Sequence, residues 1–302
     1  MMKAMIIQIL ISCLLLSCTK INRDKQVNKE DLTGDDYRLF QNTPAWDLAK
    51  AVQDEDEKMI NEIVSKDPKL INYQDPKFGN TLLILTIMNQ QIKPFKVLVA
   101  DKADINIHNN YEGTSAVIEA CSFKQYDIKF AEILLQNGAN ANDIQTDKSE
   151  PNKVKSALMK ASKTGKLDLV ELLLKNGADI NYQNEYGQSA LSECVMVERY
   201  NVAIYLLQKG ADNERPIFYR PDYSIPVEKQ DPNDKGKPMY LVDVLREDFF
   251  DFNTDEYKYK MQIVDFLKSK GIDYRSTPIP DYIKKKAQEE YLNNWKEYLE
   301  KY

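Results

Sequence analysis

Histidine is almost absent from this chain of 302 residues, in which His108 stands alone. A single histidine cannot supply a multi-histidine metal site, and no cysteine is placed to complete such a site with it. The sequence also lacks a glycine-rich phosphate loop after a strand pattern, and its 47 acidic residues include no pair whose spacing marks acid–base catalysis. These absences predict a protein that is not an enzyme and that uses no metal and no other cofactor.

A strongly basic stretch is also missing. The formal net charge is −6, and loss of Lys3 with an amino-terminal signal would make it about −7 by counting charges. The run Lys284-Lys285-Lys286 is short and is followed by Glu289 and Glu290, which is typical of one solvated face of a helix. The composition therefore argues against nucleic acid as a partner.

The sequence lacks an apolar run long enough to cross a membrane. The amino-terminal run from Ala4 to Leu16 has 13 residues, whereas a transmembrane helix needs about 20. With Lys3 before it and Ser17-Cys18 after it, the segment resembles the signal of a bacterial lipoprotein, in which residues 1–17 are removed and the sulfur of Cys18 receives a diacylglycerol. The alternatives are an ordinary secretory signal and a buried amino-terminal helix, and the near absence of polar positions at a helical period argues against the helix.

This resemblance implies a place in the cell envelope. Several acyl chains anchor a protein firmly to a membrane. Thr19 follows Cys18 where an aspartate would suggest retention in the inner membrane, so the implied place is the periplasmic face of the outer membrane of a Gram-negative bacterium. In an organism with one membrane, the outer leaflet of that membrane is expected instead. Residues 18–43 are mostly polar and are expected to form a flexible tether.

A phrase of similar sequence recurs along the rest of the chain. Its clearest copy is Asn-Gly-Ala-Asp-Ile-Asn at residues 176–181, with related copies at 102–106, 137–142 and 209–212. Four asparagines close successive copies at intervals of 34, 36 and 39 residues: Asn72, Asn106, Asn142 and Asn181. A glycine that opens an apolar stretch repeats in the same phase, and two markers in one register indicate a stack of similar units.

The best-preserved unit, residues 151–185, predicts two short helices. Ser156 is a suitable cap for the first of them. Leucines between Leu169 and Leu174 form the apolar stripe of the second, which should end at Asn176-Gly177 because glycine readily adopts the left-handed conformation. One such unit cannot bury its apolar face alone, so neighbouring units must stack.

These residues resemble the ankyrin-repeat family, whose unit reads roughly G-x-T-P-L-H-x-A-A followed by G-H-x-x-I-V-x-L-L-L-x-x-G-A-D-x-N. The resemblance covers about residues 45–275, although Ser, Ala and Leu replace the T-P-L-H tetrapeptide. It implies an all-α solenoid of about six helix-turn-helix repeats within residues 44–277. The expected repeats cover residues 44–77, 78–111, 112–150, 151–185, 186–213 and 236–275, with an insertion at 214–237 and a C-terminal capping helix at 278–302.

The four cysteines are not expected to form a disulfide. Cys13 would leave with the signal and Cys18 would carry lipid. Cys121 and Cys194 fall near the ends of first helices two repeats apart, which places them about 16 Å apart or more, whereas a disulfide needs Cα atoms within about 7 Å. Both are expected to be reduced, buried packing residues.

In this family the finger tips and the adjoining first helices line a concave side that contacts partners. The resemblance therefore makes ring-bearing finger residues the candidates for partner binding: Tyr73, Phe78, His108 and Tyr182. Tyr111 and Tyr186 precede the opening glycine of the next repeat, and packing between fingers is the favoured interpretation of that pair. The insertion adds Phe218, Tyr219 and Tyr223, and it either contacts a partner or covers an apolar edge, since loop length does not separate the two.

Together the resemblances predict a lipid-anchored envelope protein that binds a protein partner of unknown identity. A sharper hypothesis is an immunity protein that neutralises a toxin, which rests on fold and location alone. A different class is an envelope scaffold or assembly factor. A hydrolase with an unrecognised acidic site ranks last, and it predicts an activity that disappears when one carboxylate pair is changed.

Overall fold

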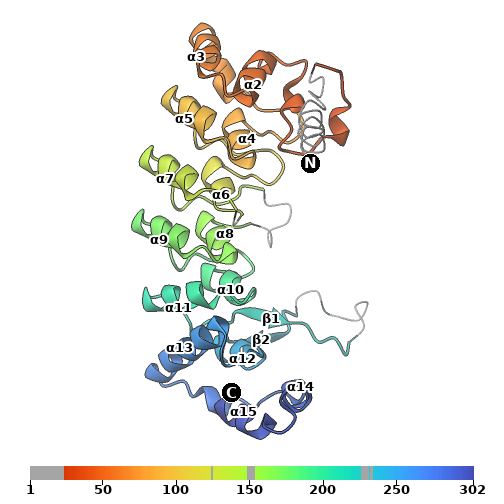
Figure 1. Cartoon of the computed structure of the whole chain (residues 1–302), viewed down its shortest axis with the longest axis vertical. Helices are drawn as coiled ribbons and strands as arrows, with labels where there is room; N and C mark the ends of the chain where they lie inside the picture. Colours follow the sequence, from red (N-terminus) through yellow and green to blue (C-terminus); the bar gives the residue numbers. More distant parts are fainter. Residues whose placement is uncertain (1–23, 124, 148–153, 226–230, 232–233) are drawn as a thin grey trace, which may run out of the picture. The chain divides into compact units, whose positions relative to one another are not determined.

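The computed structural model describes residues 24–123, 125–147, 154–225, 231 and 234–302 (Figure 1). The chain forms two compact units, residues 1–103 and 104–302, which are described separately. None of the helices in the described part of the chain is both long and apolar enough to cross a membrane. The expected signal at 1–17 and the expected lipid site at Cys18 lie outside the described residues.

The described part of unit 1 contains two helix pairs and three short 3₁₀ helices. Its elements are η1 (Lys29–Asp31), η2 (Tyr37–Phe40), α2 (Trp46–Gln53), α3 (Glu57–Lys66), η3 (Pro68–Asn72), α4 (Leu82–Met88) and α5 (Ile92–Ala100). The helices pack because their apolar faces meet, with α2 against α3 and α4 and with α5 against α3 and α4. Leu48, Leu85 and Phe95 are fully buried between them.

The segment that leads into the first repeat is folded. Leu39 and Phe40 are fully buried, and η2 packs against α2. The ring of Phe40 lies 6.4 Å from that of Tyr73, between centroids. The prediction of a flexible tether over residues 18–43 is therefore wrong from residue 29 onward, because apolar residues there cover a face of the first helix pair that no earlier repeat covers.

The described part of unit 2 contains four helix pairs, a short strand pair, the 3₁₀ helix η6 (Tyr274–Ser276) and a C-terminal helical module. The pairs are α6 (Ala116–Ala120) with α7 (Ile128–Gln136), α8 (Ala157–Thr164) with α9 (Leu167–Lys175), α10 (Ala190–Val195) with α11 (Tyr200–Gln208), and α12 (Leu241–Leu245) with α13 (Asp255–Ser269). First helices pack on first helices and second helices on second helices, as α8 does on α6 and α10, and α9 on α7 and α11. Within the described residues, the two pairs of unit 1 and these four confirm the expected all-α class, and each pair lies inside one expected repeat range.

The recurring phrase has a structural explanation in unit 2. Gly177 has a φ of +85°, as expected for a left-handed residue after a helix. The side chain of Asn142 accepts a hydrogen bond from the Asp179 amide at 2.6 Å and donates to the Gly177 carbonyl at 2.9 Å. Asn181 accepts in the same way from the Asp212 amide at 2.8 Å. The asparagine that closes one phrase therefore binds the next phrase along the chain.

The insertion begins and ends in a two-stranded antiparallel sheet of β1 (Phe218–Arg220) and β2 (Lys237–Met239). Ile217 and Met239 at its base are buried, whereas Tyr223 beyond the strands is 81% exposed. The base of the described insertion thus covers apolar surface, and its outer part is open to solvent. The covering interpretation applies to the base of the insertion, and partner contact by its outer part stays a prediction.

The C-terminal segment forms two helices, so the prediction of a single capping helix at 278–302 is wrong. They are α14 (Asp281–Tyr291) and α15 (Trp295–Lys301). Leu292 ends α14 with a positive φ of 23°, and α15 packs back on α14. The turn lets two helices share one core, whose buried members are Ile283, Ala287, Tyr298 and Tyr302.

This module docks on a lengthened loop of the last repeat, residues 246–254 between α12 and α13. The hydroxyl of Tyr302 lies 2.8 and 2.7 Å from the carbonyl oxygens of Arg246 and Asp248. The hydroxyl of Tyr298 donates to the carbonyl of Phe250 at 2.9 Å. Backbone carbonyls that a longer loop leaves outside helices are thereby satisfied by tyrosine hydroxyls.

A buried ionisable pair lies beneath Tyr302. Nζ of Lys260 donates to the backbone oxygen of Asp248 at 2.9 Å and lies 3.8 Å from the centroid of the Tyr302 ring. Burial lowers the pKa of Lys260 from 10.5 to about 7, opposed by the charge of Asp248. Burial also raises the pKa of Asp248 from 3.8 to about 7, opposed by the charge of Lys260. Each charged form is therefore disfavoured in the folded chain.

We expect the stability of this region to pass through a minimum near pH 7. Between pH 3.8 and about 7 the folded chain retains a proton on Asp248 that the unfolded chain has released, so stability falls as pH rises. Between about 7 and 10.5 the unfolded chain retains a proton on Lys260 that the folded chain has released, so stability rises with pH. Each slope is at most about 1.4 kcal/mol per pH unit.

Urea unfolding measured across this pH range checks the expectation. The Asp248→Asn variant should lose the slope on the acid side, and the Lys260→Met variant should lose the slope on the alkaline side. A wild-type profile with one continuous slope would contradict it.

Candidate protein-binding surface

Unit 2 carries four turns, or fingers, that lead into the first helices α6, α8, α10 and α12 and lie on one side of the helix pairs (Figure 1). We call them the finger row; its described parts fall within residues 107–114, 143–156, 182–189 and 217–239. Short antiparallel contacts close the bases of the last three, which are Ile144 with Ser156, Gln183 with Ser189, and β1 with β2.

Side-chain amides fix the shape of the finger turns. Oδ1 of Asn109 accepts from the amides of Glu112 at 3.1 Å and Thr114 at 3.0 Å. Oδ1 of Asn184 accepts from the amides of Tyr186 at 3.1 Å and Gln188 at 3.0 Å. Asparagine readily bonds nearby backbone in this way, and these hydrogen bonds hold the first and third turns.

The first two fingers are bound to each other. Nε2 of His108 lies 3.1 Å from Oδ1 of Asp143 in the next finger, and the hydroxyl of Ser115 donates to the other oxygen of that carboxylate. The amide of Thr146 donates to the carbonyl of Gly113 at 3.0 Å. The predicted contact residue His108 is thus half-buried and serves as a bridge between fingers.

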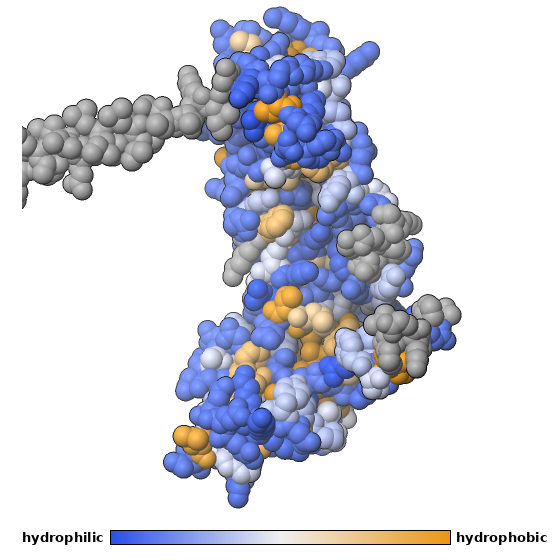
Figure 2. Space-filling view, turned by 90° about the vertical axis from the view of Figure 1, so that its right-hand side faces the viewer, coloured by the Kyte–Doolittle hydropathy of each residue, from blue (hydrophilic) through white to orange (hydrophobic). Residues whose placement is uncertain are grey.

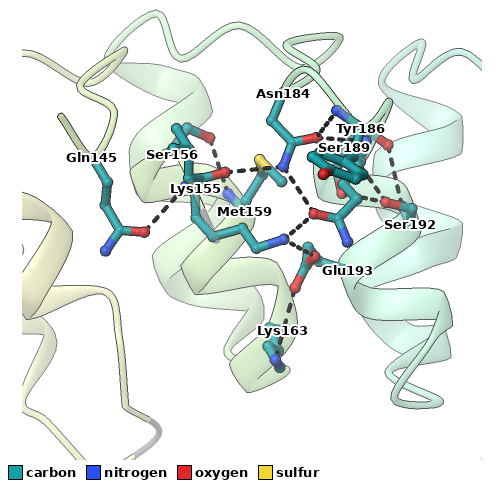
Figure 3. A network of polar contacts seen from close by, with 12 residues as sticks. Gln145, Lys155, Ser156, Met159, Lys163, Asn184, Tyr186, Ser189, Ser192 and Glu193 are labelled. Carbon is teal, nitrogen blue, oxygen red and sulfur yellow. Dashed lines mark hydrogen bonds and ion pairs between the residues drawn. The ribbon is translucent and has the colours of Figure 1, made fainter. Parts of the chain in front are cut away.

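A second network joins the second finger to the third (Figure 3). Nζ of Lys155 forms an ion pair with Oε1 of Glu193 at 2.8 Å and donates to the side-chain oxygen of Gln188. The side chain of Asn184 donates to the carbonyl of Val154 at 3.1 Å and to Gln188 at 2.8 Å. The Lys155 and Glu193 side chains are only 13% and 10% exposed, so the pair is shielded from solvent and fixes the geometry of the row.

The first helices α6 and α8 each carry a buried ionisable side chain. Burial raises the pKa of Glu119 in α6, opposed by a hydrogen bond from the hydroxyl of Tyr126 at 3.1 Å. Burial lowers the pKa of Lys160 in α8, opposed by the charges of Glu112 and Glu119. Within the described residues, no group of three or more His, Cys, Asp or Glu side chains is placed to hold a metal ion.

Tyrosines stand out from this framework. Tyr111 is 63% exposed, Tyr186 59% and Tyr223 81%. Figure 2 views the molecule from the side on which Figure 1 draws the fingers, and this face is mainly hydrophilic with hydrophobic residues in small groups. Amphipathic tyrosines on a cross-linked polar support are the kind of side chain that protein-binding surfaces use as anchors.

The family model for ankyrin repeats in three copies matches residues 48–145 and 129–216, together more than half of the chain. The chain belongs to the ankyrin-repeat family. Ankyrin repeats form protein-interaction modules, and the family resemblance of the sequence is thereby confirmed. The helix pairs, left-handed glycines and asparagine bonds described above are the ankyrin unit as it occurs in this chain.

Ankyrin-repeat proteins of viruses and animals are among the relatives. The chain is 26% identical over 164 residues to an ankyrin repeat protein of fowlpox virus, covering 53% of this chain and 26% of the viral one. It is 33% identical over 99 residues to an ankyrin repeat protein of a mimivirus of Acanthamoeba polyphaga, covering 33% of this chain and 60% of the other. An ankyrin repeat and KH domain-containing protein of Caenorhabditis elegans is 25% identical over 170 residues, 56% of this chain and 6% of its own length. The matches thus cover less than two thirds of each relative.

The sequence-predicted contact residues of the ankyrin fingers are mostly half-buried. Tyr73 and Phe78 lie in unit 1 and are half-covered. Tyr182 is half-buried and lines a cleft of about 230 Å³ with Asn142 and Asp179. The side chains of Tyr73, Phe78 and Tyr182 are therefore partly shielded from solvent.

The contact residues predicted in the insertion differ in exposure. Phe218 is half-buried, with the Arg220 guanidinium 5.6 Å from its ring centroid. Tyr219 is 37% exposed, and Nζ of Lys235 lies 5.8 Å from its ring centroid. Tyr223 is far more open than either, so the outer part of the insertion offers the larger contact area.

Packing between fingers was the favoured interpretation of Tyr111 and Tyr186. Both side chains are nevertheless more than half exposed, because they stand at the tips of turns, within two residues of a left-handed glycine. The neighbouring Glu112 and Glu185 were the sequence signal for this outcome, since a charged neighbour marks a solvated turn.

The two cysteines of the ankyrin repeats are packing residues as expected. Cys121 and Cys194 are free and fully buried. Burial raises the pKa of the Cys121 thiol to about 12 and also raises that of Cys194. Neither thiol therefore has the exposed thiolate character that reactive cysteines need.

Proposed function

We propose that this chain binds a partner protein through the finger row of unit 2. The observation that carries the proposal is the set of exposed tyrosines on fingers that are held by asparagine turns and by the Lys155–Glu193 pair. A support that is already ordered in the free protein loses little conformational entropy when the partner docks. Tyrosine adds large contact area with only two side-chain torsions to fix.

We further propose that the protein is anchored in the cell envelope through a lipid on Cys18, at the periplasmic face of an outer membrane. The support is the sequence before Cys18, which combines Lys3, a short apolar run and the small residue Ser17. A lipid anchor would hold the ankyrin repeats at a membrane surface where a partner arrives.

The anchor is tested by replacing Cys18 with serine in the full chain. The wild-type protein should sediment with membranes and enter the detergent phase, and Cys18→Ser should shift it to the soluble or unprocessed fraction, since lipidation needs the thiol. Thr19→Ser serves as the control and should leave the distribution unchanged. Equal membrane association of Cys18→Ser and wild type would contradict the anchor and leave the binding surface untouched.

The role of the complex separates two versions of the proposal. In the first, the chain is an immunity protein, and its deletion should make cells more sensitive to a toxin delivered by sister cells. In the second, it is an envelope scaffold or assembly factor, and its deletion should disturb an envelope function with no toxin present. The identity of a stoichiometric partner, captured by crosslinking in intact cells, distinguishes them.

A further inference from the structure

In unit 1 another segment of the chain covers a finger tip. The tip Lys77-Phe78 precedes the left-handed Gly79, and residues 30–34 of the same unit lie across it. Nζ of Lys77 donates to the carbonyls of Glu30 at 2.7 Å and Leu32 at 3.1 Å, and a Cβ on Gly34 would lie 3.9 Å from the Phe78 ring. An aromatic tip of this fold therefore takes a stretch of chain, to which the finger presents a cation and the stretch presents carbonyl oxygens.

In unit 2 the equivalent tips carry the opposite charge. Tyr111-Glu112 precedes Gly113, and Glu185-Tyr186 precedes Gly187, where both glycines have a positive φ. The same pairing of acid and tyrosine recurs in the outer part of the insertion as Asp222-Tyr223. All three acids are exposed, and all three tyrosines are more than half exposed.

The acids of the two regular tips, Glu112 and Glu185, have no basic ion-pair partner in the described part of the chain. Glu112 accepts a hydrogen bond from the side-chain amide of Gln145 at 3.2 Å. Hydrogen bonds from the hydroxyl and amide of Ser224 hold the pKa of Asp222 below its ordinary value.

Several basic residues in the described part of this face are already paired. Lys155 and Lys163 both contact Glu193, at 2.8 and 3.9 Å, and Arg220 binds Glu247 at 2.7 Å. Lys235, which lies near the ring of Tyr219, and Lys237 are exposed within the insertion. Within the described residues, the unpaired charge at the two regular tips is therefore negative.

We infer that the acid–tyrosine tips of unit 2 bind a basic segment of the partner protein, with lysine or arginine side chains against the tyrosine rings and carboxylates. The inference rests on the proposed function and adds the chemistry of the partner. A cation can contact both side chains of each tip, since it is attracted to the face of an aromatic ring and to a carboxylate. Tyr111 and Tyr186 are two repeats apart, or about 16–20 Å at the usual helix spacing, which an extended segment of about six residues spans. The basic side chains should therefore recur about six residues apart.

Site-specific photo-crosslinking in cells tests this on the full chain. A photoreactive phenylalanine analogue replaces Tyr111, Tyr186 or Tyr223 in turn, and Tyr259, an exposed tyrosine of α13, is the matched control. The expected product joins the three tip positions, and not position 259, to segments rich in lysine and arginine. Tip crosslinks to neutral or acidic segments, or to a second copy of this chain, would overturn the inference and leave protein binding standing. Crosslinks to no protein at any position would overturn the proposed function as well.

A charge-matched pair of variants tests the same inference in solution. The probe is a synthetic glycine–serine peptide with lysine or arginine at every sixth position, and its counterpart carries glutamate there. The triple change Glu112→Gln, Glu185→Gln and Asp222→Asn should weaken binding of the basic probe about tenfold. The control triple Glu171→Gln, Glu256→Gln and Asp265→Asn, which removes the same charge from second helices, should change it less than about twofold. Equal weakening by both triples, or binding of the glutamate probe as tight as that of the basic probe, would overturn the inference.

Discussion

Replacing Tyr302 with alanine is expected to lower the free energy of unfolding of the C-terminal module by about 3 to 5 kcal/mol. Tyr302 is 1% exposed, its hydroxyl reaches the carbonyls of Arg246 and Asp248, and its ring covers Nζ of Lys260. Alanine would leave a cavity, two carbonyls without this donor and a buried amine without its ring. Each of these changes lowers the free energy of unfolding of the module.

Tryptophan fluorescence during urea unfolding measures this effect. The chain has two tryptophans, so a Trp46→Phe background leaves Trp295 in α15 as the reporter of the module. Tyr302→Phe keeps the ring and removes only the hydroxyl, and it should cost about 1 kcal/mol. Leu292→Ala, at a side chain that is 74% exposed, should cost little. Equal losses for the alanine and phenylalanine variants of Tyr302 would show that ring burial does not hold the module.

Replacing Gly113 with alanine should destabilise unit 2 by about 2 to 4 kcal/mol. The φ of Gly113 is +64°, and a left-handed conformation costs an L-residue about 1–2 kcal/mol. A Cβ at this position would also fall onto the backbone nitrogens of Thr146 and Asp147. The second finger must therefore move, which breaks the bond from the Thr146 amide to the Gly113 carbonyl at a cost of about 1 kcal/mol.

Gly177→Ala is the matched control for this prediction. Gly177 has a φ of +85°, yet a Cβ there would meet nothing within 4 Å. The Gly177→Ala variant should therefore lose only the stability that the left-handed backbone conformation costs an L-residue, about 1–2 kcal/mol. Urea unfolding followed by circular dichroism compares the two variants, and an equal loss of stability in both would show that the second finger does not press on Gly113.

The repeat structure was predictable from the sequence because its signals are local and recur. The left-handed conformation of Gly177, the cap at Ser156, whose hydroxyl accepts from the Met159 amide at 3.2 Å, and the burial of Cys121 all follow from positions within one unit. Each unit repeats the same contacts with its neighbours, so a pattern that recurs at a fixed interval reports tertiary packing as well as helix formation.

The candidate site was predictable only in part. The fingers were located correctly, but His108 and Tyr182 proved half-buried, whereas Tyr111 and Tyr186 proved exposed. Tyr186 and Phe78 both stand beside a tip glycine, and residues 30–34 lie across Phe78. Exposure of a finger residue depends on which distant segment packs on it, and one repeat does not encode that.

The sequence by itself determined the ankyrin fold, the register of the repeats and the burial of the cysteines, because these depend on local patterns that occur several times. The tertiary structure decided what happens where the pattern stops. Residues 29–40 fold onto the first repeat, Tyr298 and Tyr302 dock on the lengthened loop 246–254, and the tips at Tyr111 and Tyr186 stay open to solvent. Each of these outcomes depends on contacts made once, between segments distant in sequence, whose free energy no repeated pattern records.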